Sequence, residues 1–236
     1  ILKFCNLKSG NTVLDIGCGI GRHSITLAKL GLKVTGIDYL ENLITCARNN
    51  CPEKTVELEF HVGDCRYINL NRTFDAVLCL YDVIGSYADE AENIKILINV
   101  AKHLKSGGIA LLSVMNYGLT ENLATQFFSL SKEPDKLLGL KPSNNMERTG
   151  EIFDPEYYMI DRENRVIYRR EQFTEGKNLP TELIVRDRRY YRRDIEKMCR
   201  DVGLIVQWSR FIRAGDWNTN LESHNAKEIL ICCKKL

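Results

Sequence analysis

The stretch that decides the fold is Val13-Leu14-Asp15-Ile16-Gly17-Cys18-Gly19-Ile20-Gly21. Residues 12–16 form a short apolar run, which predicts a buried strand, and the glycines that follow predict a sharp turn into a helix over 22–30. Glycine permits a tight turn and lets a ligand approach the main chain closely. The stretch therefore predicts a strand, a turn able to bind a ligand, and a helix.

Strand and helix patterns alternate after this stretch. Apolar runs predict strands, and apolar residues three and four apart predict the helices between them. The expected strands are 12–16, 34–37, 58–62, 74–80 and 109–115, and the expected helices are 22–30, 40–47 and 94–101. Such alternation predicts an α/β fold, with a parallel sheet and helices on both faces. Folds of this kind bind ligands at the carboxyl ends of their strands.

The pattern changes after residue 116. Residues 117–150 are mixed and predict a helical or loop segment, whereas residues 150–190 alternate in polarity, which predicts three antiparallel strands. One more helix and two more strands are expected at 191–202, 204–208 and 228–233. We therefore expect a single domain over residues 1–236, with residues 117–190 as an insertion after the fifth strand.

Composition disfavours several classes of protein. The formal net charge is +2, from 33 Lys and Arg against 31 Asp and Glu, which argues against a bulk electrostatic nucleic-acid binder. No apolar stretch approaches the ~20 residues that span a bilayer, so no membrane partner is expected. The nine cysteines are odd in number and form no CxxC pair. This favours buried thiols in a reducing, cytoplasmic compartment over disulfides or a metal site.

Acidic residues stand where three of the expected strands end. Asp15 precedes the glycines, Asp38 ends the second strand and Asp64 follows the third. A dinucleotide site favours G-x-G-x-x-G, whereas the spacing here is G-x-G-x-G, and the Asp15 carboxylate would repel a pyrophosphate. That carboxylate would suit the charged methionine part of S-adenosylmethionine. Asp38 could bind the ribose hydroxyls of either a dinucleotide or S-adenosylmethionine, so it does not distinguish between the two cofactors. The structural alternative is a tight turn whose acids only cap helices.

The order of the motifs resembles the class I S-adenosylmethionine-dependent methyltransferases. The motifs are VLDIGCGIGRHS, VTGIDYLENLI, VGDCRYI, FDAVLCLYDVIGSY and LKSGGIALLSVMN, and they cover residues 12–116. A TGEIFD-like segment, the antiparallel insertion and RRYYRRDIEKMCRDVGL then resemble a small-molecule branch of the family. The resemblance implies a Rossmann-like, doubly wound sheet of seven strands with the last strand antiparallel. It also implies S-adenosyl-L-methionine as the cofactor.

The resemblance further implies roles for residues that match the family motifs. The methionine portion of the cofactor would be surrounded by Asp15, Gly17, Cys18, Gly19 and Gly21. The other implied contacts are Asp38 with the ribose, Tyr39 with the adenine, Asp64 and Cys65 with the adenine edge, and Leu80 and Tyr81 with the region of the methyl-bearing sulfur.

Two features depart from the family pattern. Helices usually precede the first strand and close over the cofactor, but this chain begins with Ile1, without Met and close to that strand. We expect such a lid to lie upstream of Ile1 or to be disordered. The segment after the fourth strand is Leu80-Tyr81-Asp82-Val83. Many amino-methylases of nucleic-acid bases carry Asn/Asp-Pro-Pro-Tyr/Phe there.

Methyl transfer requires a nucleophile aligned opposite the sulfur, and a general base only where the acceptor starts protonated. His23, Tyr81 and Asp82 are candidate catalytic residues because they follow strand ends. Packing at a helix start is the alternative for His23, and capping is the alternative for Asp82. Candidate acceptor contacts are Tyr87, Asn116, Tyr117 and Trp217, with burial against the sheet or surface packing as the alternative for the aromatic residues.

Positive charge gathers in Arg186-Asp187-Arg188-Arg189-Tyr190-Tyr191-Arg192-Arg193. Strand alternation would point Arg186 and Arg188 to one face, and Asp187 and Arg189 to the other. We therefore expect a solvated surface rather than a single binding patch. An anionic small substrate or a nucleic acid is the alternative, because arginine recognises carboxylates and phosphates.

The sequence thus predicts an enzyme that moves a methyl group from S-adenosylmethionine to an amine or hydroxyl of a small-molecule acceptor. The insertion over 117–190 would form part of the acceptor site and could mediate a homodimer. The alternatives are an RNA methyltransferase that uses the Arg-rich insertion, a cofactor-binding but non-catalytic partner subunit, and a dehydrogenase.

Overall fold

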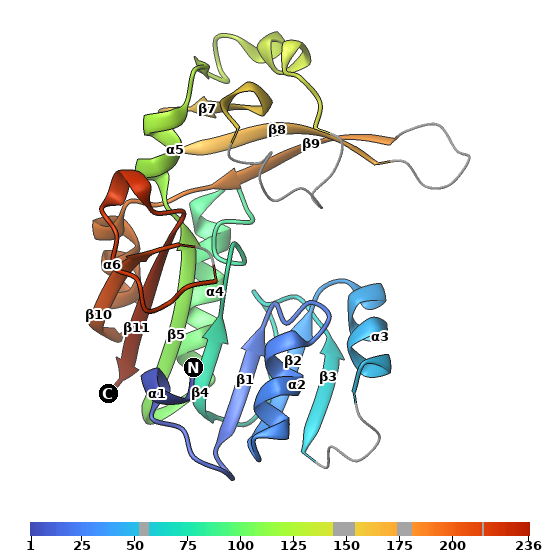
Figure 1. Cartoon of the computed structure of the whole chain (residues 1–236), viewed down its shortest axis with the longest axis vertical. Helices are drawn as coiled ribbons and strands as arrows, with labels where there is room; N and C mark the ends of the chain where they lie inside the picture. Colours follow the sequence, from blue (N-terminus) through green and yellow to red (C-terminus); the bar gives the residue numbers. More distant parts are fainter. Residues whose placement is uncertain (52–56, 144–153, 174–180, 214) are drawn as a thin grey trace.

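The computed structural model describes residues 1–51, 57–143, 154–173, 181–213 and 215–236 (Figure 1). The TGEIFD-like segment therefore lies outside the described residues, apart from Asp154. Within the described ranges the strands form one sheet of seven and a smaller sheet of four. No helix in this part of the chain is both long and apolar enough to cross a membrane.

The larger, central sheet has the strand order β3-β2-β1-β4-β5-β11-β10. Its strands are β1 (Thr12–Ile16), β2 (Lys33–Asp38), β3 (Leu58–Val62), β4 (Phe74–Cys79), β5 (Leu104–Met115), β10 (Leu204–Ile212) and β11 (Glu228–Lys235). The first five pair in parallel, whereas β11 runs antiparallel to both of its neighbours, β5 and β10. The strand order reverses between β1 and β4, and α/β sheets bind ligands at such a reversal. The predicted seven-stranded sheet with an antiparallel last strand is confirmed.

Helices cover both faces of this sheet. They are α1 (Leu2–Cys5), α2 (Arg22–Lys29), α3 (Glu41–Asn49), α4 (Glu90–Lys102) and α6 (Arg192–Asp201). Buried residues of α4 and α6 share one apolar cluster with strands β1, β4, β5 and β11. Buried residues of α1 and α2 belong to a second cluster, which packs on the other side chains of the same strands. The predicted doubly wound arrangement is therefore confirmed.

Two strands extend well beyond the ranges that the sequence predicts. The fifth strand, expected over 109–115, begins already at Leu104 in β5, directly after α4 ends at Lys102. Leu104 pairs with Phe74, and the register then shifts, so a bulge in the strand absorbs the glycines that resembled a helix stop. β10 continues to Ile212 because its pairing with β11 resumes after a similar shift near Trp208.

The smaller sheet lies in the insertion and has the order β6-β7-β8-β9. Its strands are β6 (Phe127–Phe128), β7 (Tyr158–Asp161), β8 (Val166–Phe173) and β9 (Thr181–Arg188), preceded by helix α5 (Tyr117–Leu123) and accompanied by the short 3₁₀ turns η1 (Pro134–Gly139) and η3 (Pro155–Tyr157). Strands β7, β8 and β9 are antiparallel, as predicted. The two-residue strand β6 pairs in parallel with β7 and was not predicted, because two residues carry no periodic signal.

Main-chain contacts fix the insertion above the carboxyl ends of β4 and β5 (Figure 1). The Arg188 amide, at the end of β9, donates to the Gly85 carbonyl at 2.7 Å, in the loop after β4. The Tyr190 amide donates to the Met115 carbonyl at 3.1 Å, at the end of β5. The small sheet therefore covers the edge at which a ligand of this fold would bind.

Candidate active site

The glycine loop joins the carboxyl end of β1 to α2. Gly17, Gly19 and Gly21 have φ angles of 72°, 54° and 79°, in the left-handed region that glycine adopts at little cost. The amides of Gly17 and Cys18 both donate to the Ile37 carbonyl, at 2.8 and 3.0 Å. These bonds hold the loop against the end of β2.

Only one of these three glycines faces open space. A Cβ atom on Gly17 would lie 2.3 Å from Val83 Cγ2, and one on Gly21 would lie 2.7 Å from Phe60 Cζ. A Cβ atom on Gly19 would meet nothing within 4 Å. Gly17 and Gly21 thus allow close packing inside the protein, whereas Gly19 leaves its main chain open to a ligand.

Two of the predicted acids lie beside this loop. Asp38 accepts a hydrogen bond from the Gly19 amide at Oδ2 (2.9 Å) and one from the Leu40 amide at Oδ1 (3.0 Å). Asp15 is 3% exposed, and its Oδ2 atom accepts a hydrogen bond from Ser24 Oγ at 2.6 Å. Burial, partly opposed by the Ser24 bond, raises the pKa of Asp15 to about 6. Asp38 is partly exposed and keeps acceptor capacity for a ligand.

A pocket of 230 Å³ opens between the glycine loop and the end of β4. Its lining consists of Asp15, Gly17, Cys18, Gly19, Ile20, Arg22, His23, Leu80 and Tyr81. All of these except Ile20 and Arg22 belong to the predicted site. The structure therefore brings together residues from two separate strand ends, as expected where the strand order reverses.

Two aromatic side chains, Tyr81 and Trp217, lie beside His23, and of these Tyr81 lines the pocket together with His23. The ring centroids of His23 and Tyr81 are 6.2 Å apart, and those of His23 and Trp217 are 6.0 Å apart. Tyr81 has a φ of 65°, and its amide donates to Ser113 Oγ at 2.6 Å. A non-glycine residue held in this backbone region indicates a position fixed by its surroundings. Burial, with a smaller effect of Arg22, lowers the pKa of His23, so its ring is neutral at pH 7.

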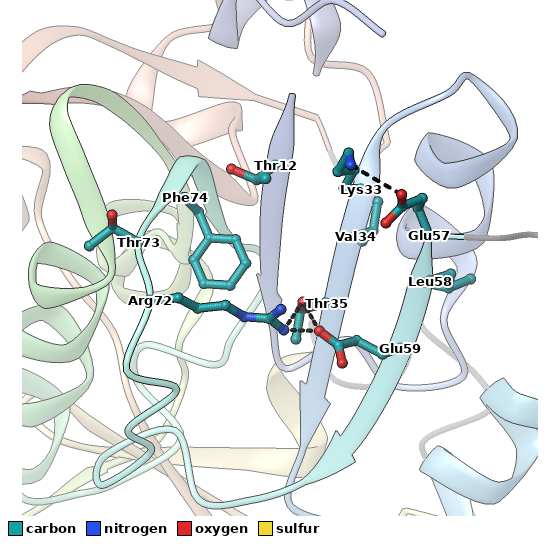
Figure 2. Close-up of a pocket in the computed structure, with 10 residues that line it drawn as sticks. All are labelled: Thr12, Lys33, Val34, Thr35, Glu57, Leu58, Glu59, Arg72, Thr73 and Phe74. Atoms are coloured by element: carbon teal, nitrogen blue, oxygen red, sulfur yellow. Dashed lines mark hydrogen bonds and ion pairs between the residues drawn. The ribbon is translucent and has the colours of Figure 1, made fainter. Parts of the chain in front are cut away.

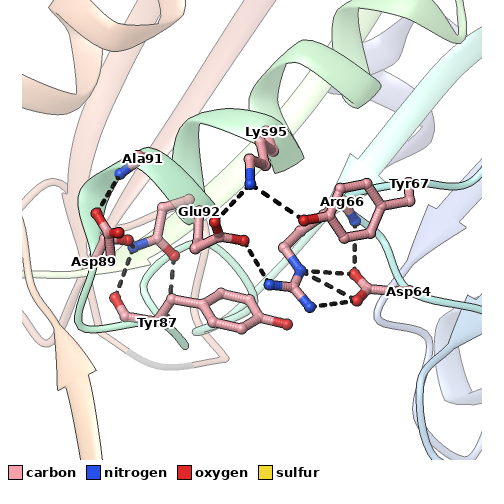
Figure 3. Close-up of polar contacts among 9 residues, drawn as sticks. Asp64, Arg66, Tyr67, Tyr87, Asp89, Ala91, Glu92 and Lys95 are labelled. Carbon is pink, nitrogen blue, oxygen red and sulfur yellow. Dashed lines mark hydrogen bonds and ion pairs between the residues drawn. The ribbon is translucent and has the colours of Figure 1, made fainter.

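Asp64 forms an ion pair within its own loop (Figure 3). Its carboxylate lies 2.5 Å from Arg66 Nη2 and also accepts hydrogen bonds from Arg66 Nε at 3.0 and 3.1 Å. The same guanidinium pairs with Glu92 at 2.5 Å and lies 4.3 Å from the Tyr87 ring centroid. Hydrogen bonding to Arg66 lowers the pKa of Asp64. Tyr87 therefore contacts Arg66, a partner that the sequence analysis did not identify.

The remaining predicted cofactor residues border the same edge of the sheet. Tyr39 directly follows β2 and is 69% exposed, so its ring is accessible to a ligand. Cys65 is half-buried beside Asp64, and burial raises the pKa of its thiol to about 11. Its carbonyl accepts a hydrogen bond from Asn99 Nδ2 at 2.9 Å, which ties this loop to α4. The thiol is therefore uncharged at neutral pH.

Asn116 and Tyr117 are buried where β5 meets the insertion, each 1% exposed. Asn116 Nδ2 donates to the carbonyls of Ser223 and Ala226, at 2.7 and 2.8 Å, and its Oδ1 atom caps α5. The Tyr117 ring packs edge-on against Tyr191, with 5.0 Å between centroids. Both side chains thus connect α5 to the late part of the chain, including the turn η4 (Ser223–Asn225).

Asp82 lies near charged residues that the sequence analysis did not identify. Its side chain is exposed to solvent, and desolvation by the surrounding protein raises its pKa, with a further effect of Asp187. The additional polar residues of this region are Ser113, Arg169, Glu171, Asp187, Arg189 and Glu228, all buried. Arg169 and Arg189 oppose the rise in the pKa of Asp82.

The prediction of a solvated Arg-rich surface is wrong for three residues. Asp187, Arg189 and Tyr190 are 6%, 1% and 0% exposed. Asp187 lies on a face of β9 that is turned into the protein, and Arg189 and Tyr190 directly follow that strand. The sequence of β8 contains a signal for this burial. Arg169 and Glu171 lie on the same strand face as the buried Ile167. Charged residues that share a face with a core residue predict a buried polar site.

A second pocket, of 290 Å³, lies at the opposite end of the central sheet (Figure 2). It is lined by the first residues of four strands, Thr12, Lys33, Leu58 and Phe74, and by their neighbours. Lys33 pairs with Glu57 at 3.0 Å, and Arg72 pairs with Glu59. We do not assign the active site there, because α/β folds bind ligands at the carboxyl ends. The described residues also contain no group of three potential metal ligands.

Comparison with known proteins finds relatives of the first half of the chain. Residues 13–108 match a family model described as a methyltransferase domain. A ubiquinone biosynthesis O-methyltransferase from Rickettsia canadensis (strain McKiel) is 33% identical over 105 residues, 44% of this chain and 42% of that protein. A cypemycin N-terminal methyltransferase from Streptomyces sp is 34% identical over 103 residues, 44% of this chain and 41% of that protein. The matches thus span less than half the length of these curated relatives.

Solved structures align over nearly the whole chain. An S-adenosylmethionine-dependent methyltransferase from Clostridium acetobutylicum ATCC 824 aligns with a TM-score of 0.65 and 19% identity, over 95% of this chain and 83% of its own. The CcbJ methyltransferase from Streptomyces caelestis aligns with a TM-score of 0.71 and 14% identity, over 98% and 91%. At these identities the likeness shows the fold, while the family model covers the glycine loop and the acids at the strand ends. Residues 13–108 therefore match the methyltransferase domain family, and the chain as a whole shares the fold of solved S-adenosylmethionine-dependent methyltransferases.

Proposed function

We propose that the chain transfers the methyl group of S-adenosylmethionine to an amine or hydroxyl group of a small-molecule acceptor. The observation that carries this proposal is the pocket between the glycine loop and β4, which combines a buried acid, open main chain at Gly19 and the ring of Tyr81. Among the relatives, one is named as an O-methyltransferase and another as an N-terminal methyltransferase. These names support an oxygen or nitrogen acceptor.

We assign donor binding to the residues around this pocket. Asp15 and the loop formed by Gly17, Cys18, Gly19 and Gly21 would hold the methionine portion. Among the described residues, each oxygen of Asp38 accepts one hydrogen bond, so Asp38 keeps lone pairs for ribose hydroxyls. The exposed Tyr39 ring would lie against the adenine, and Asp64 and Cys65 would border its edge.

When bound, S-adenosylmethionine supplies a methyl group activated by a positively charged sulfur. The chain must orient the acceptor and exclude water. Leu80 and Tyr81 line the pocket and would border the reacting centre. His23, whose pKa is lowered, would be able to accept a proton, and Asp82 would take one from a protonated acceptor, because its raised pKa makes it a stronger base.

We propose unequal roles for the four candidate acceptor residues. Trp217 packs beside His23, which lines the pocket, and would be the one of the four to contact the acceptor directly. Tyr87 lies against Arg66 and would shape the adjoining wall. Asn116 and Tyr117 would act by holding the insertion in place, because both are buried and Asn116 has its amide engaged by main-chain groups.

We further propose that residues 1–236 form one domain and that the insertion over 117–190 forms part of the acceptor site. The edge strand β9 leaves Leu183 and Ile184 exposed, which supports a homodimer through the insertion. Analytical ultracentrifugation of the wild type and of Leu183→Glu tests the dimer.

The cysteines support a location for the protein. No disulfide joins the described cysteines, which supports a reducing compartment such as the cytoplasm.

Calorimetry with S-adenosylhomocysteine and with NAD tests the cofactor assignment. We expect binding of S-adenosylhomocysteine and none of NAD; the reverse preference would indicate a dehydrogenase. Formation of S-adenosylhomocysteine from S-adenosylmethionine, followed across small amines, alcohols and RNA, tests the reaction. Turnover with RNA alone would contradict a small-molecule acceptor, and no turnover with any acceptor would favour a non-catalytic partner subunit.

A further inference from the structure

Six charged residues gather where the small sheet meets the carboxyl ends of the central strands, and we refer to them as the buried charged cluster. They are Asp82, Arg169, Glu171, Asp187, Arg189 and Glu228. All except Asp82 are at most 6% exposed. Ile167 pairs with Asp187 in the sheet, so Arg169 and Glu171 of β8 share a face with Asp187 of β9. Figure 1 shows both strands above the central sheet.

The cluster holds more negative than positive groups. It contains four carboxyl groups and two guanidinium groups, and both arginines lie at the same acid. Arg169 Nη2 is 2.9 Å from Asp187 Oδ1, and Arg189 Nε is 3.5 Å from Asp187 Oδ2. Within the described ranges, neither Asp82 nor Glu228 has a Lys or Arg nitrogen within 4.0 Å. Counted over its six described members, the ionised cluster would therefore carry a net negative charge.

Glu171 is the least satisfied member of the cluster. Its side chain is 0% exposed, and neither carboxyl oxygen accepts a hydrogen bond from any described group. The nearest cation in that part of the chain is Arg169 Nη2 at 3.6 Å, which is already bonded to Asp187. Burial raises the pKa of Glu171, with further effects of Asp187 and Asp82. A buried carboxylate without donors needs either a proton or a cationic partner.

A short chain of contacts leads from the donor pocket to this cluster. Tyr81 lines the pocket, and Asp82 follows it in sequence. The Tyr81 amide donates to Ser113 Oγ, and the Ser113 side chain is also hydrogen-bonded to Glu228. The Asp82 charge acts on both Glu171 and Glu228. Asp82 and Ser113 therefore connect the cluster to Tyr81 on the pocket wall.

We infer that the methyl acceptor is a cationic amine, and that Glu171 binds its ammonium group with Asp82 beside it. This inference rests on the proposed methyltransferase function and narrows its acceptor to one chemical class. Because two arginines already neutralise Asp187, a neutral alcohol or an anion would leave the negative excess uncompensated. An ammonium ion supplies the missing charge and up to three hydrogen-bond donors.

The test uses the full chain loaded with S-adenosylhomocysteine, titrated with ammonium probes. Benzylammonium, cyclohexylammonium and 1,4-butanediammonium are each compared with benzyl alcohol, cyclohexanol and 1,4-butanediol. We expect at least one ammonium probe to bind the loaded protein at least about tenfold more tightly than its alcohol, as a charge-assisted hydrogen bond implies. Equal affinity within every pair would overturn the inference. Failure to bind S-adenosylhomocysteine would instead contradict the proposed function.

The variant Glu171→Gln distinguishes a carboxylate that binds an ammonium group from a protonated acid that only packs inside the protein. Glutamine has the shape of the neutral carboxyl group but cannot carry its negative charge. We expect the variant to keep its affinity for S-adenosylhomocysteine and to lose the preference for ammonium probes. The matched control is Glu182→Gln, an exposed acid of the same sheet that pairs with Arg170, and it should keep that preference. An unchanged preference in Glu171→Gln contradicts the inference. So does a selective loss of S-adenosylmethionine affinity relative to S-adenosylhomocysteine, which would assign Glu171 to the donor sulfonium.

Discussion

The Gly19 amide donates a hydrogen bond to Asp38 Oδ2 at 2.9 Å, across 19 residues of chain. This contact joins the glycine loop after β1 to the acid that ends β2. The Gly17 and Cys18 amides reinforce it, since both donate to the Ile37 carbonyl. The proposed ribose-binding acid and the loop that would hold the methionine portion are therefore arranged before a ligand enters, which reduces the entropy lost on binding.

Asp38→Ala should weaken S-adenosylhomocysteine binding by about 1–3 kcal/mol, because hydrogen bonds to a charged group and the anchor of the Gly19 amide are both lost. Isothermal titration calorimetry measures the change. The matched control is Glu41→Ala, which removes an acid three residues away in the first turn of α3. Unchanged affinity in Asp38→Ala would contradict the ribose assignment.

Gly17→Ala should destabilise the protein more than Gly19→Ala does. Both residues have positive φ angles, so each alanine costs roughly 1–2 kcal/mol of backbone strain. Only the Gly17 methyl would also collide with Val83, which should add about 1–3 kcal/mol of overpacking. Denaturant unfolding of the two variants measures the difference.

The double variant Gly17→Ala/Val83→Ala identifies the cause of that loss. Removing the two Val83 methyl groups should restore part of the stability, because they are the atoms nearest the new Cβ. If the unfolding free energy lost in the double variant equals the sum of the losses in the two single variants, the collision with Val83 does not contribute.

The sequence predicts the central sheet well, because each strand is indicated by its own short stretch of residues. Each of the first three strands ends at, or is followed by, a glycine or an acid, so the strand and its site residue are read from the same few positions. Asp15, Gly17, Gly19 and Leu80 meet at one pocket because a parallel sheet gathers its carboxyl ends. The bulge at residues 105–108 is not predictable in this way, because the same glycines also stop helices.

The charged residues of the insertion show where prediction from the sequence ends. Whether Asp187 and Arg189 face water depends on what covers their side of β9, and strand alternation gives only the two faces. The partner of Asp64 poses a similar problem. Arg66 is two residues away, but its tie to Glu92 depends on how α4 packs against the loop after β3. Such contacts are set by tertiary packing.

Asp15→Asn should change how stability depends on pH. The pKa of Asp15 is about 6 in the folded protein, against 3.8 as the ordinary value, so the folded state holds this proton more tightly than the unfolded state. Wild-type stability should therefore fall as pH rises between about 4 and 6, by up to about 3 kcal/mol, and the asparagine variant should lack this contribution. Denaturant unfolding across this range measures it. If the stabilities of the wild type and of Asp15→Asn change with pH in the same way, the pKa of Asp15 is not raised.

Arg66→Ala should raise the pKa of Asp64 towards its ordinary value, because the guanidinium hydrogen bonds that lower it are lost. The lowered pKa makes Asp64 contribute stability that is present above its ordinary pKa of 3.8 and is lost as pH falls through the folded value. The variant should therefore lose less stability on acidification than the wild type. Carboxyl carbon NMR measures the pKa directly. Lys95→Ala is the control, since Lys95 reaches Asp64 only as a minor charge effect.

Ser113→Ala should weaken S-adenosylhomocysteine binding as well as stability. Ser113 Oγ accepts the hydrogen bond of the Tyr81 amide, which holds Tyr81 at its positive φ on the pocket wall. Leaving this amide and Glu228 without the hydroxyl should cost about 1–3 kcal/mol of folding stability, and should let Tyr81 leave its position. The matched control is Ser209→Ala on β10, which loses its bond to Glu196 far from the pocket. The control should lose stability alone, so an equal loss of affinity in both serine variants would show that Ser113 does not position Tyr81.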